Sequence, residues 1–174
     1  MRELVVFAAI LVGWAAAEAL SSTLDRPGPR TLARATGLVL LAGHVAGVVE
    51  HVLRGVRWPY GLAAGCVLAA AGVALRIAAI VTLGREFASR LGAGRLVTAG
   101  PYRWMRHPSE AGLLLAAVGC ALVLASWAAL AAALVLVPLS LVRCSREDVA
   151  LAADHPTAYR TWARDVGWFW PRLR

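Results

Sequence analysis

The polar stretch over residues 95–112 gathers side chains that could bind a charged small molecule. It reads RLVTAGPYRWMRHPSEAG and stands between two apolar runs, where a connector needs only a few polar residues. Pro108 should stop the preceding structure and Ser109 should cap the next helix, which places Arg106 and His107 at a helix N-terminus. The free amides and positive dipole end there favour a carboxylate group. A basic anchor with interfacial Trp and Tyr residues is the alternative.

A second polar group follows the last apolar run. Arg143 and Glu147 are four residues apart in RCSREDVAL and share one helix face, which Leu151 continues with an apolar side chain. A simple salt bridge between them is one interpretation. The other is convergence with His107 on one polar cavity, if the two preceding apolar runs form a hairpin. The aromatic-rich segment 159–171 would then lie on the membrane interface and cover that cavity.

Other polar residues interrupt the apolar runs. Glu50 and His51 stand near a helix end and are expected at the membrane interface. His44 and Arg76 lie deeper, where an inter-helix hydrogen bond or ion pair is the simpler interpretation and lining of a substrate cavity is the alternative. The cysteines are isolated at Cys66, Cys120 and Cys144. Their spacing predicts small buried thiols rather than a metal site or disulfides.

Membrane helices must position all these groups. The 174 residues are 60% hydrophobic, the mean hydropathy is +0.67, and the charges cluster between long apolar runs. Because a bilayer core about 30 Å thick needs roughly 20 apolar residues per helix, the chain predicts an all-α, polytopic membrane protein with about five transmembrane helices. No room remains for a separate nucleotide-binding domain of the βαβ type. The expected spans are residues 4–20, 36–52, 61–83, 110–124 and 127–141.

The connections and the arginines predict the topology. Only Ala125 and Ser126 or their neighbours join the last two spans, which indicates a tight helical hairpin. The first run lacks a basic leader and a convincing cleavage site and is expected to be retained as a span. Fourteen of the 18 arginines fall on one side of the membrane if the N-terminus is outside and the C-terminus is cytosolic. This topology explains the charge of +8 without a nucleic-acid partner. The absence of lysine suggests a GC-rich bacterial genome, and hence a bacterial cytoplasmic membrane.

The second half of the chain resembles the isoprenylcysteine carboxyl methyltransferase family of membrane enzymes. The matching residues are, in order, Leu96, Val97, Gly100, Tyr102, Arg106, His107, Pro108, Ser109, Gly112, Gly119, Arg143, Glu147, Asp148, Leu151, Tyr159 and Pro171. An R-H-P motif alone is weak evidence for the family. The same motif is fairly specific for the family when an apolar hairpin and then the pattern R-x-x-x-E-[ED]-x-x-L follow it in the sequence. The first two spans carry no signature of the family.

The resemblance implies methyl transfer from S-adenosylmethionine without a Rossmann domain. The residues it assigns to the cofactor are Leu96, Val97, Gly100, Tyr102, Arg106, His107, Pro108, Ser109 and Glu147. It attributes Arg143 to the acceptor carboxylate. Two residues depart from the family pattern: Asp148 replaces a second Glu, and Glu110 stands where an aromatic residue is common. Glu110 is therefore a further candidate for contact with the substrate.

The expected reaction is O-methylation of the carboxylate of a lipidic, isoprenylcysteine-like acceptor that enters from the bilayer. A carboxylate is ionised at neutral pH and needs no general base, so Arg143 would orient it through a forked contact. His107 is expected to bind rather than to act as a base. The alternatives are an acidic hydroxyl of a long-chain alkylpyrone or alkylresorcinol as acceptor, an NADPH-dependent membrane reductase, and a non-enzymatic membrane protein. No metal is expected.

The chain should form a single membrane domain, with three spans in residues 1–84 and a cytosolic cofactor pocket and catalytic region in residues 85–174.

Overall fold

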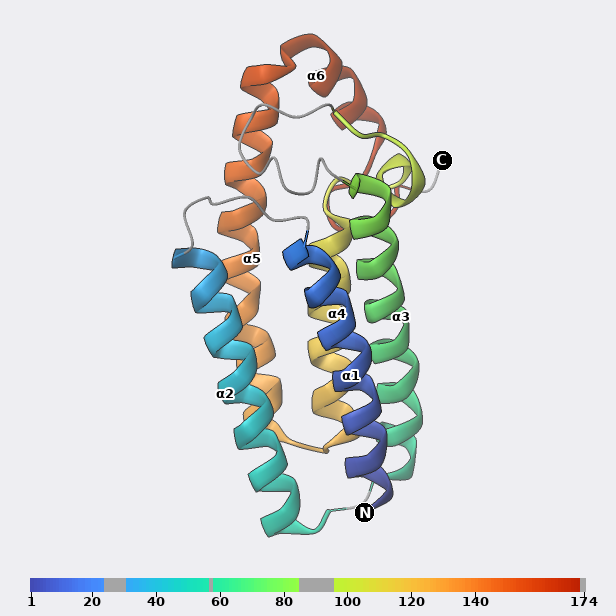
Figure 1. The fold of residues 1–174 in the computed structure, drawn as a ribbon, viewed down its shortest axis with the longest axis vertical. Helices are drawn as coiled ribbons and strands as arrows, with labels where there is room; N and C mark the ends of the chain where they lie inside the picture. The colour runs from blue at the N-terminus through green and yellow to red at the C-terminus, as the bar shows by residue number, and fades with distance from the viewer. Residues whose placement is uncertain (24–30, 57, 85–95, 173–174) are drawn as a thin grey trace.

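The computed structural model describes residues 1–23, 31–56, 58–84 and 96–172. Five long helices lie side by side along the longest axis of the molecule, and a short sixth helix crosses one end (Figure 1). The elements are α1 (Arg2–Thr23), α2 (Thr31–Arg54), α3 (Pro59–Leu83), the 3-10 helix η2 (Gly100–Arg103), α4 (Pro108–Val123), α5 (Trp127–Asp154) and α6 (Pro156–Asp165). The predicted all-helical membrane fold is confirmed, and each expected span coincides with a helix.

The helices differ in how they suit a membrane. Three of the described helices, α2, α3 and α5, are long and apolar enough to cross a bilayer. Helix α4 is apolar but has 16 residues, so at 1.5 Å per residue it reaches only about 24 Å. Helix α5 continues beyond its expected end at Leu141 to Asp154, because the polar residues that follow the apolar run keep a helical pattern. The arginines at 26, 30, 57, 85, 90, 95 and 174 lie outside the described residues.

Different segments of the chain lie at the two ends of the bundle. One end carries the N-terminus, the end of α2, the start of α3 and the α4–α5 turn, whereas residues 96–107, α6 and residues 166–172 lie at the opposite end (Figure 1). The α4–α5 hairpin is as tight as predicted: Ala125 has a positive φ of 47°, and the Ser126 hydroxyl accepts a hydrogen bond from the Ala129 amide at 3.1 Å. Residues 96–107 and the described part of the C-terminal segment therefore share one end of the molecule.

Glu50 and His51 join α2 to this hairpin at one end of the bundle, where they were expected near the interface. The Glu50 carboxylate accepts hydrogen bonds from the Ser126 hydroxyl at 2.6 Å and the Ala128 amide at 2.9 Å. His51 is buried and its Nδ1 lies 2.8 Å from the carbonyl oxygen of Leu124. Both residues bind backbone groups that the ends of α4 and α5 leave unpaired.

Small residues bring α3 and α4 into close backbone contact. A Cβ atom built on Gly72 would lie 2.5 Å from the amide nitrogen of Ala116 and 2.6 Å from the carbonyl oxygen of Gly112. A Cβ on Gly112 would lie 2.6 Å from the carbonyl oxygen of Gly72. Close approach through small residues is a common way to pack helices in lipid, where water does not drive association. The approach also fixes the register in which Arg76 of α3 reaches the start of α4.

Gly72→Ala should therefore destabilise the protein by ~1–3 kcal/mol, because the new methyl group meets backbone atoms that cannot move independently. Gly37 of α2 is the matched control, since a Cβ atom there meets nothing within 4 Å and alanine is a better helix former than glycine. We expect Gly37→Ala to keep or raise the unfolding temperature in detergent, and Gly72→Ala to lower it. Equal unfolding temperatures for the two variants would contradict the close packing.

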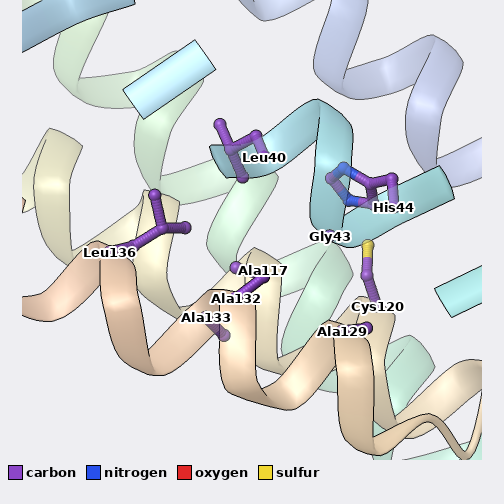
Figure 2. Close-up of a pocket in the computed structure, with 9 residues that line it drawn as sticks. All are labelled: Leu40, Gly43, His44, Ala117, Cys120, Ala129, Ala132, Ala133 and Leu136. Carbon is purple, nitrogen blue, oxygen red and sulfur yellow. The ribbon is translucent and has the colours of Figure 1, made fainter. Parts of the chain in front are cut away.

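A small apolar cavity lies between α2, α4 and α5 (Figure 2). Its lining includes His44 and Leu40 of α2, Cys120 of α4 and Leu136 of α5. The volume of about 10 Å³ accommodates about one water molecule, so this cavity is not a cofactor pocket. The ring of His44 lies 5.5 Å from that of Phe7 on α1.

Candidate active site

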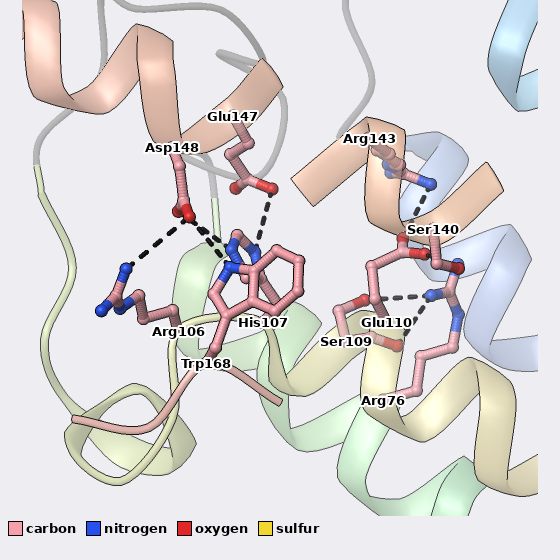
Figure 3. A network of polar contacts seen from close by, with 10 residues as sticks. All are labelled: Arg76, Arg106, His107, Ser109, Glu110, Ser140, Arg143, Glu147, Asp148 and Trp168. Atoms are coloured by element: carbon pink, nitrogen blue, oxygen red, sulfur yellow. Dashed lines mark hydrogen bonds and ion pairs between the residues drawn. The ribbon is translucent and has the colours of Figure 1, made fainter. Parts of the chain in front are cut away.

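Polar contacts gather at the end of the bundle that carries α6 (Figure 3). They form two groups, both located around the start of α4 and along α5 from Ser140 onward. The histidine cluster contains Arg106, His107, Glu147, Asp148 and Trp168. The glutamate cluster contains Arg76, Ser109, Glu110, Ser140 and Arg143. Both contain residues far apart in the sequence, so the site depends on the packing of α3, α4 and α5.

His107 is the centre of the histidine cluster. It immediately precedes α4 and is only 4% exposed. Its Nε2 lies 2.9 Å from a carboxylate oxygen of Asp148, and its Nδ1 lies 3.6 Å from one of Glu147. Burial alone would lower the pKa of His107, but Asp148, the Cys144 thiol and Glu147 outweigh it and raise the pKa to about 11. At neutral pH the imidazole is therefore a cation held between two carboxylates.

The C-terminal segment closes over this cluster. The backbone amide of Arg106 donates to the carbonyl of Gly167 at 2.8 Å, and that of His107 donates to the carbonyl of Trp168 at 3.2 Å. The indole of Trp168 donates to Asp148 at 2.9 Å and packs edge-on against the His107 ring, with centroids 5.9 Å apart. These contacts bring the aromatic tail onto the polar residues, as the sequence predicted.

Arg106 and Tyr102 tie the preceding loop to α6. The guanidinium of Arg106 donates to the carbonyl of Ala163 at 2.6 Å and lies 3.7 Å from Asp148. The carbonyl of Tyr102 accepts from the indole of Trp162 at 3.0 Å. Burial raises the pKa of the Tyr102 phenol above its usual value, and Glu147 raises it further. Tyr102 is therefore a neutral, buried phenol.

The remaining loop residues lie just before Tyr102. Leu96 and Val97 are half-buried, whereas Gly100 is exposed and has a φ of +55°. A Cβ atom on Gly100 would lie 2.6 Å from the hydroxyl of Thr82 at the end of α3. A glycine is required here both for the backbone conformation and for the close approach to α3.

Glu110 is the centre of the glutamate cluster, and it is buried with 4% exposure. One carboxylate oxygen lies 2.9 Å from the Arg143 guanidinium, and the other accepts a hydrogen bond from the Ser140 hydroxyl at 2.9 Å. Of the two interpretations of Arg143 and Glu147, the contacts favour convergence on the start of α4 over a salt bridge between them. Although the two share a face of α5, Arg143 pairs with Glu110 and Glu147 lies beside His107.

Ser109 has a different role from the predicted helix cap. His107 occupies the cap position and makes no side-chain capping bond, while Pro108 is the first residue of α4. The hydroxyl and carbonyl oxygens of Ser109 accept hydrogen bonds from Arg76 at 3.0 and 3.2 Å. The same guanidinium lies over the ring of Trp14, 5.7 Å from its centroid. The predicted inter-helix hydrogen bond of Arg76 is thus confirmed.

Sequence reasoning missed Ser140, and it predicted no individual contact for Asp148 or Trp168. Ser140 precedes Arg143 by three residues, so helical spacing could have placed both on one face. The family resemblance includes Asp148, as an Asp in place of a second Glu, but assigns it no contact, whereas in the structure it contacts His107, Arg106 and Trp168. Its importance depends on the return of the C-terminal segment, which no local pattern reveals.

The cysteines are free, with Cys120 and Cys144 buried and Cys66 half-buried. Within the described ranges, no three His, Cys, Asp or Glu side chains are arranged to hold a metal ion. The site instead offers opposite charges at one helix end: an imidazolium, guanidinium groups, carboxylates and the first amides of α4. This set suits a ligand that itself carries both a carboxylate and a cationic group.

Comparison with known families identifies the architecture. A family model described as "Isoprenylcysteine carboxyl methyltransferase (ICMT) family" matches residues 63–153, just over half of the chain. The chain belongs to this family. The match runs from α3 to the end of α5 and contains every member of the two clusters except Trp168. No curated protein sequence matches the chain at a significant level. The ICMT-family assignment makes the chain an integral membrane protein of a methyltransferase family.

Proposed function

We propose that this ICMT-family protein transfers a methyl group from S-adenosylmethionine to an oxygen of a lipophilic acceptor. The observation that carries the proposal is the pair of charged clusters at one end of an apolar helix bundle, within the segment that the family model matches. The cofactor supplies a methyl group already activated on a sulfonium sulfur. The protein then has to align an oxygen nucleophile and exclude water.

The described residues fit such a cofactor by the chemistry of their side chains. Glu147 lies at the rim of the histidine cluster with its side chain 47% exposed, so its carboxylate can face the cationic part of a ligand. The amides that begin α4 suit a carboxylate, and half-buried Leu96 and Val97 suit an apolar ring system. His107 and Arg106 already contact protein groups. We assign them to holding α4, α5 and the tail in the binding arrangement, together with Pro108, Ser109, Gly100 and Tyr102.

The acceptor oxygen belongs beside Arg143, whose side chain remains 22% exposed at the rim of the glutamate cluster. The family favours the carboxylate of an isoprenylcysteine-like lipid as acceptor. An acidic hydroxyl on a long-chain molecule is the second candidate, and the carboxylate of Glu110 next to Arg143 favours it. In both cases the hydrocarbon part of the acceptor would stay in the bilayer while the reacting oxygen reaches the glutamate cluster.

We further propose that the chain forms one membrane domain in a bacterial cytoplasmic membrane, with the end that carries α6 facing the cytosol.

Membranes containing the protein, incubated with methyl-labelled S-adenosylmethionine and a total lipid extract, should yield a labelled lipid. Matched membranes without the protein serve as the control. The label should reside on oxygen, in an ester or an ether. If purified, folded protein neither binds the cofactor nor labels any lipid, the proposal is wrong. Hydride transfer from labelled NADPH would instead establish a membrane reductase.

A further inference from the structure

Glu110 places a buried carboxylate next to the arginine that faces the acceptor. The distance of 2.9 Å between Arg143 Nη1 and Glu110 Oε1 is that of a charge-assisted hydrogen bond. Only 6% of the Glu110 side chain is exposed, so water screens the pair weakly. The guanidinium thus already has a carboxylate partner within the protein.

An ionised acceptor would meet an unfavourable arrangement here. Its carboxylate would compete with Glu110 for the same guanidinium, and two carboxylates in a poorly solvated site repel each other. An uncharged hydroxyl group would meet no such repulsion. It could donate its proton to Glu110 and receive a hydrogen bond from Arg143 at the same time.

Glu110 has the capacity to accept that proton. Among the described residues, its two oxygens have one donor each, Arg143 and Ser140, whereas each carboxylate oxygen can accept two hydrogen bonds. The Ser140 bond also fixes the orientation of the carboxylate relative to α5. Glu110 and Arg143 can therefore form an acceptor–donor pair around one hydroxyl oxygen.

From this arrangement we infer that Glu110 makes the site select an acceptor that arrives protonated, a phenolic or enolic hydroxyl, and that Glu110 takes its proton during methyl transfer. The inference rests on the proposed methyl transfer and narrows its acceptor class. The hydroxyl oxygen forms a bond to the methyl carbon as its proton passes to Glu110. The sulfur–methyl bond breaks with its electron pair remaining on sulfur, which becomes a neutral thioether. Glu110 then releases the proton to water, and the product is a methyl ether.

Two acceptors with the same alkyl chain test this selectivity, a para-alkylphenol and a fatty acid. With protein in nanodiscs and methyl-labelled S-adenosylmethionine, wild type should label the phenol at least about tenfold faster. Glu110→Gln should lower the ratio of phenol to fatty-acid labelling by about 10²-fold, the usual contribution of a proton acceptor. Partial unfolding lowers both rates together and leaves their ratio unchanged. A ratio that changes less than about threefold would overturn the inference, as would equal labelling of the two acceptors by wild type.

Equilibrium binding of a labelled fatty acid provides a readout that needs no turnover. Glu110→Gln should bind it at least about tenfold more tightly than wild type, because the competing charge next to Arg143 is gone. Glu50→Gln is the matched control: Glu50 also accepts hydrogen bonds from one arginine and one serine, but at the opposite end of the bundle. It should change neither the ratio nor the binding. Equal fatty-acid binding by wild type and Glu110→Gln rejects the inference alone, whereas absence of cofactor binding rejects the proposed function.

Discussion

Asp148→Asn should destabilise the protein by about 3 kcal/mol and weaken cofactor binding, because it removes the nearest counter-charge of a buried imidazolium. Asp148 contacts His107 at 2.9 Å and accepts the indole hydrogen bond of Trp168 at 2.9 Å. The variant would leave His107 with Glu147, which is farther away and more exposed. The C-terminal segment would also lose a charged acceptor that fixes it to α5. Unfolding temperature and binding of labelled S-adenosylmethionine measure the two effects.

The destabilisation should depend on pH. The pKa of His107 is raised from 6.5 to about 11 in the folded protein. The resulting stabilisation is complete below about pH 6.5 and is lost as the pH rises through about 11. Wild type should therefore lose stability between these values, and its advantage over Asp148→Asn should be larger at pH 6 than near pH 9.5. Asp154→Asn, an exposed position on the same helix, should show no such difference. A constant gap between wild type and Asp148→Asn would mean that His107 is not charged.

The apolar runs of the sequence were sufficient to predict the helices. Each run became one helix because a chain in lipid must satisfy its backbone hydrogen bonds within the segment. The short connection around Ser126 likewise had only one simple interpretation, a tight hairpin. That hairpin brings the start of α4 and the end of α5 to one end of the bundle, so His107 and Glu147 could be predicted as neighbours.

The partners of individual charges could not be predicted in the same way. Helical spacing puts Arg143 and Glu147 on one face of α5 but does not say which residue of α4 lies opposite each of them. The axial register of the two helices determines which residues lie opposite each other. For α3 and α4 this register follows from the backbone contact at Gly72 and Gly112, which brings Arg76 to Ser109. A sequence pattern within one helix contains no information on register between helices.

Arg143→Ala should lower methyl transfer by about 10²–10³-fold while labelled S-adenosylmethionine still binds, because we assign its guanidinium to the acceptor oxygen and Glu147, in the other cluster, to the cofactor. Arg143→Lys keeps the charge but loses the planar fork, so we expect an intermediate rate. Loss of cofactor binding in Arg143→Ala equal to that in Glu147→Gln would contradict the separate roles of the two clusters.

A double variant tests whether the stability cost of Arg143→Ala comes from the unpaired carboxylate of Glu110. Arg143→Ala alone leaves the buried carboxylate of Glu110 without its guanidinium, which should cost stability. Arg143→Ala combined with Glu110→Gln removes the unpaired charge, and Gln can still accept the hydrogen bond of Ser140. The double variant should therefore regain much of the unfolding temperature but none of the methyl transfer. Recovery of both together would contradict the roles of Arg143 and Glu110 in the reaction and leave the pair only the function of holding α4 against α5.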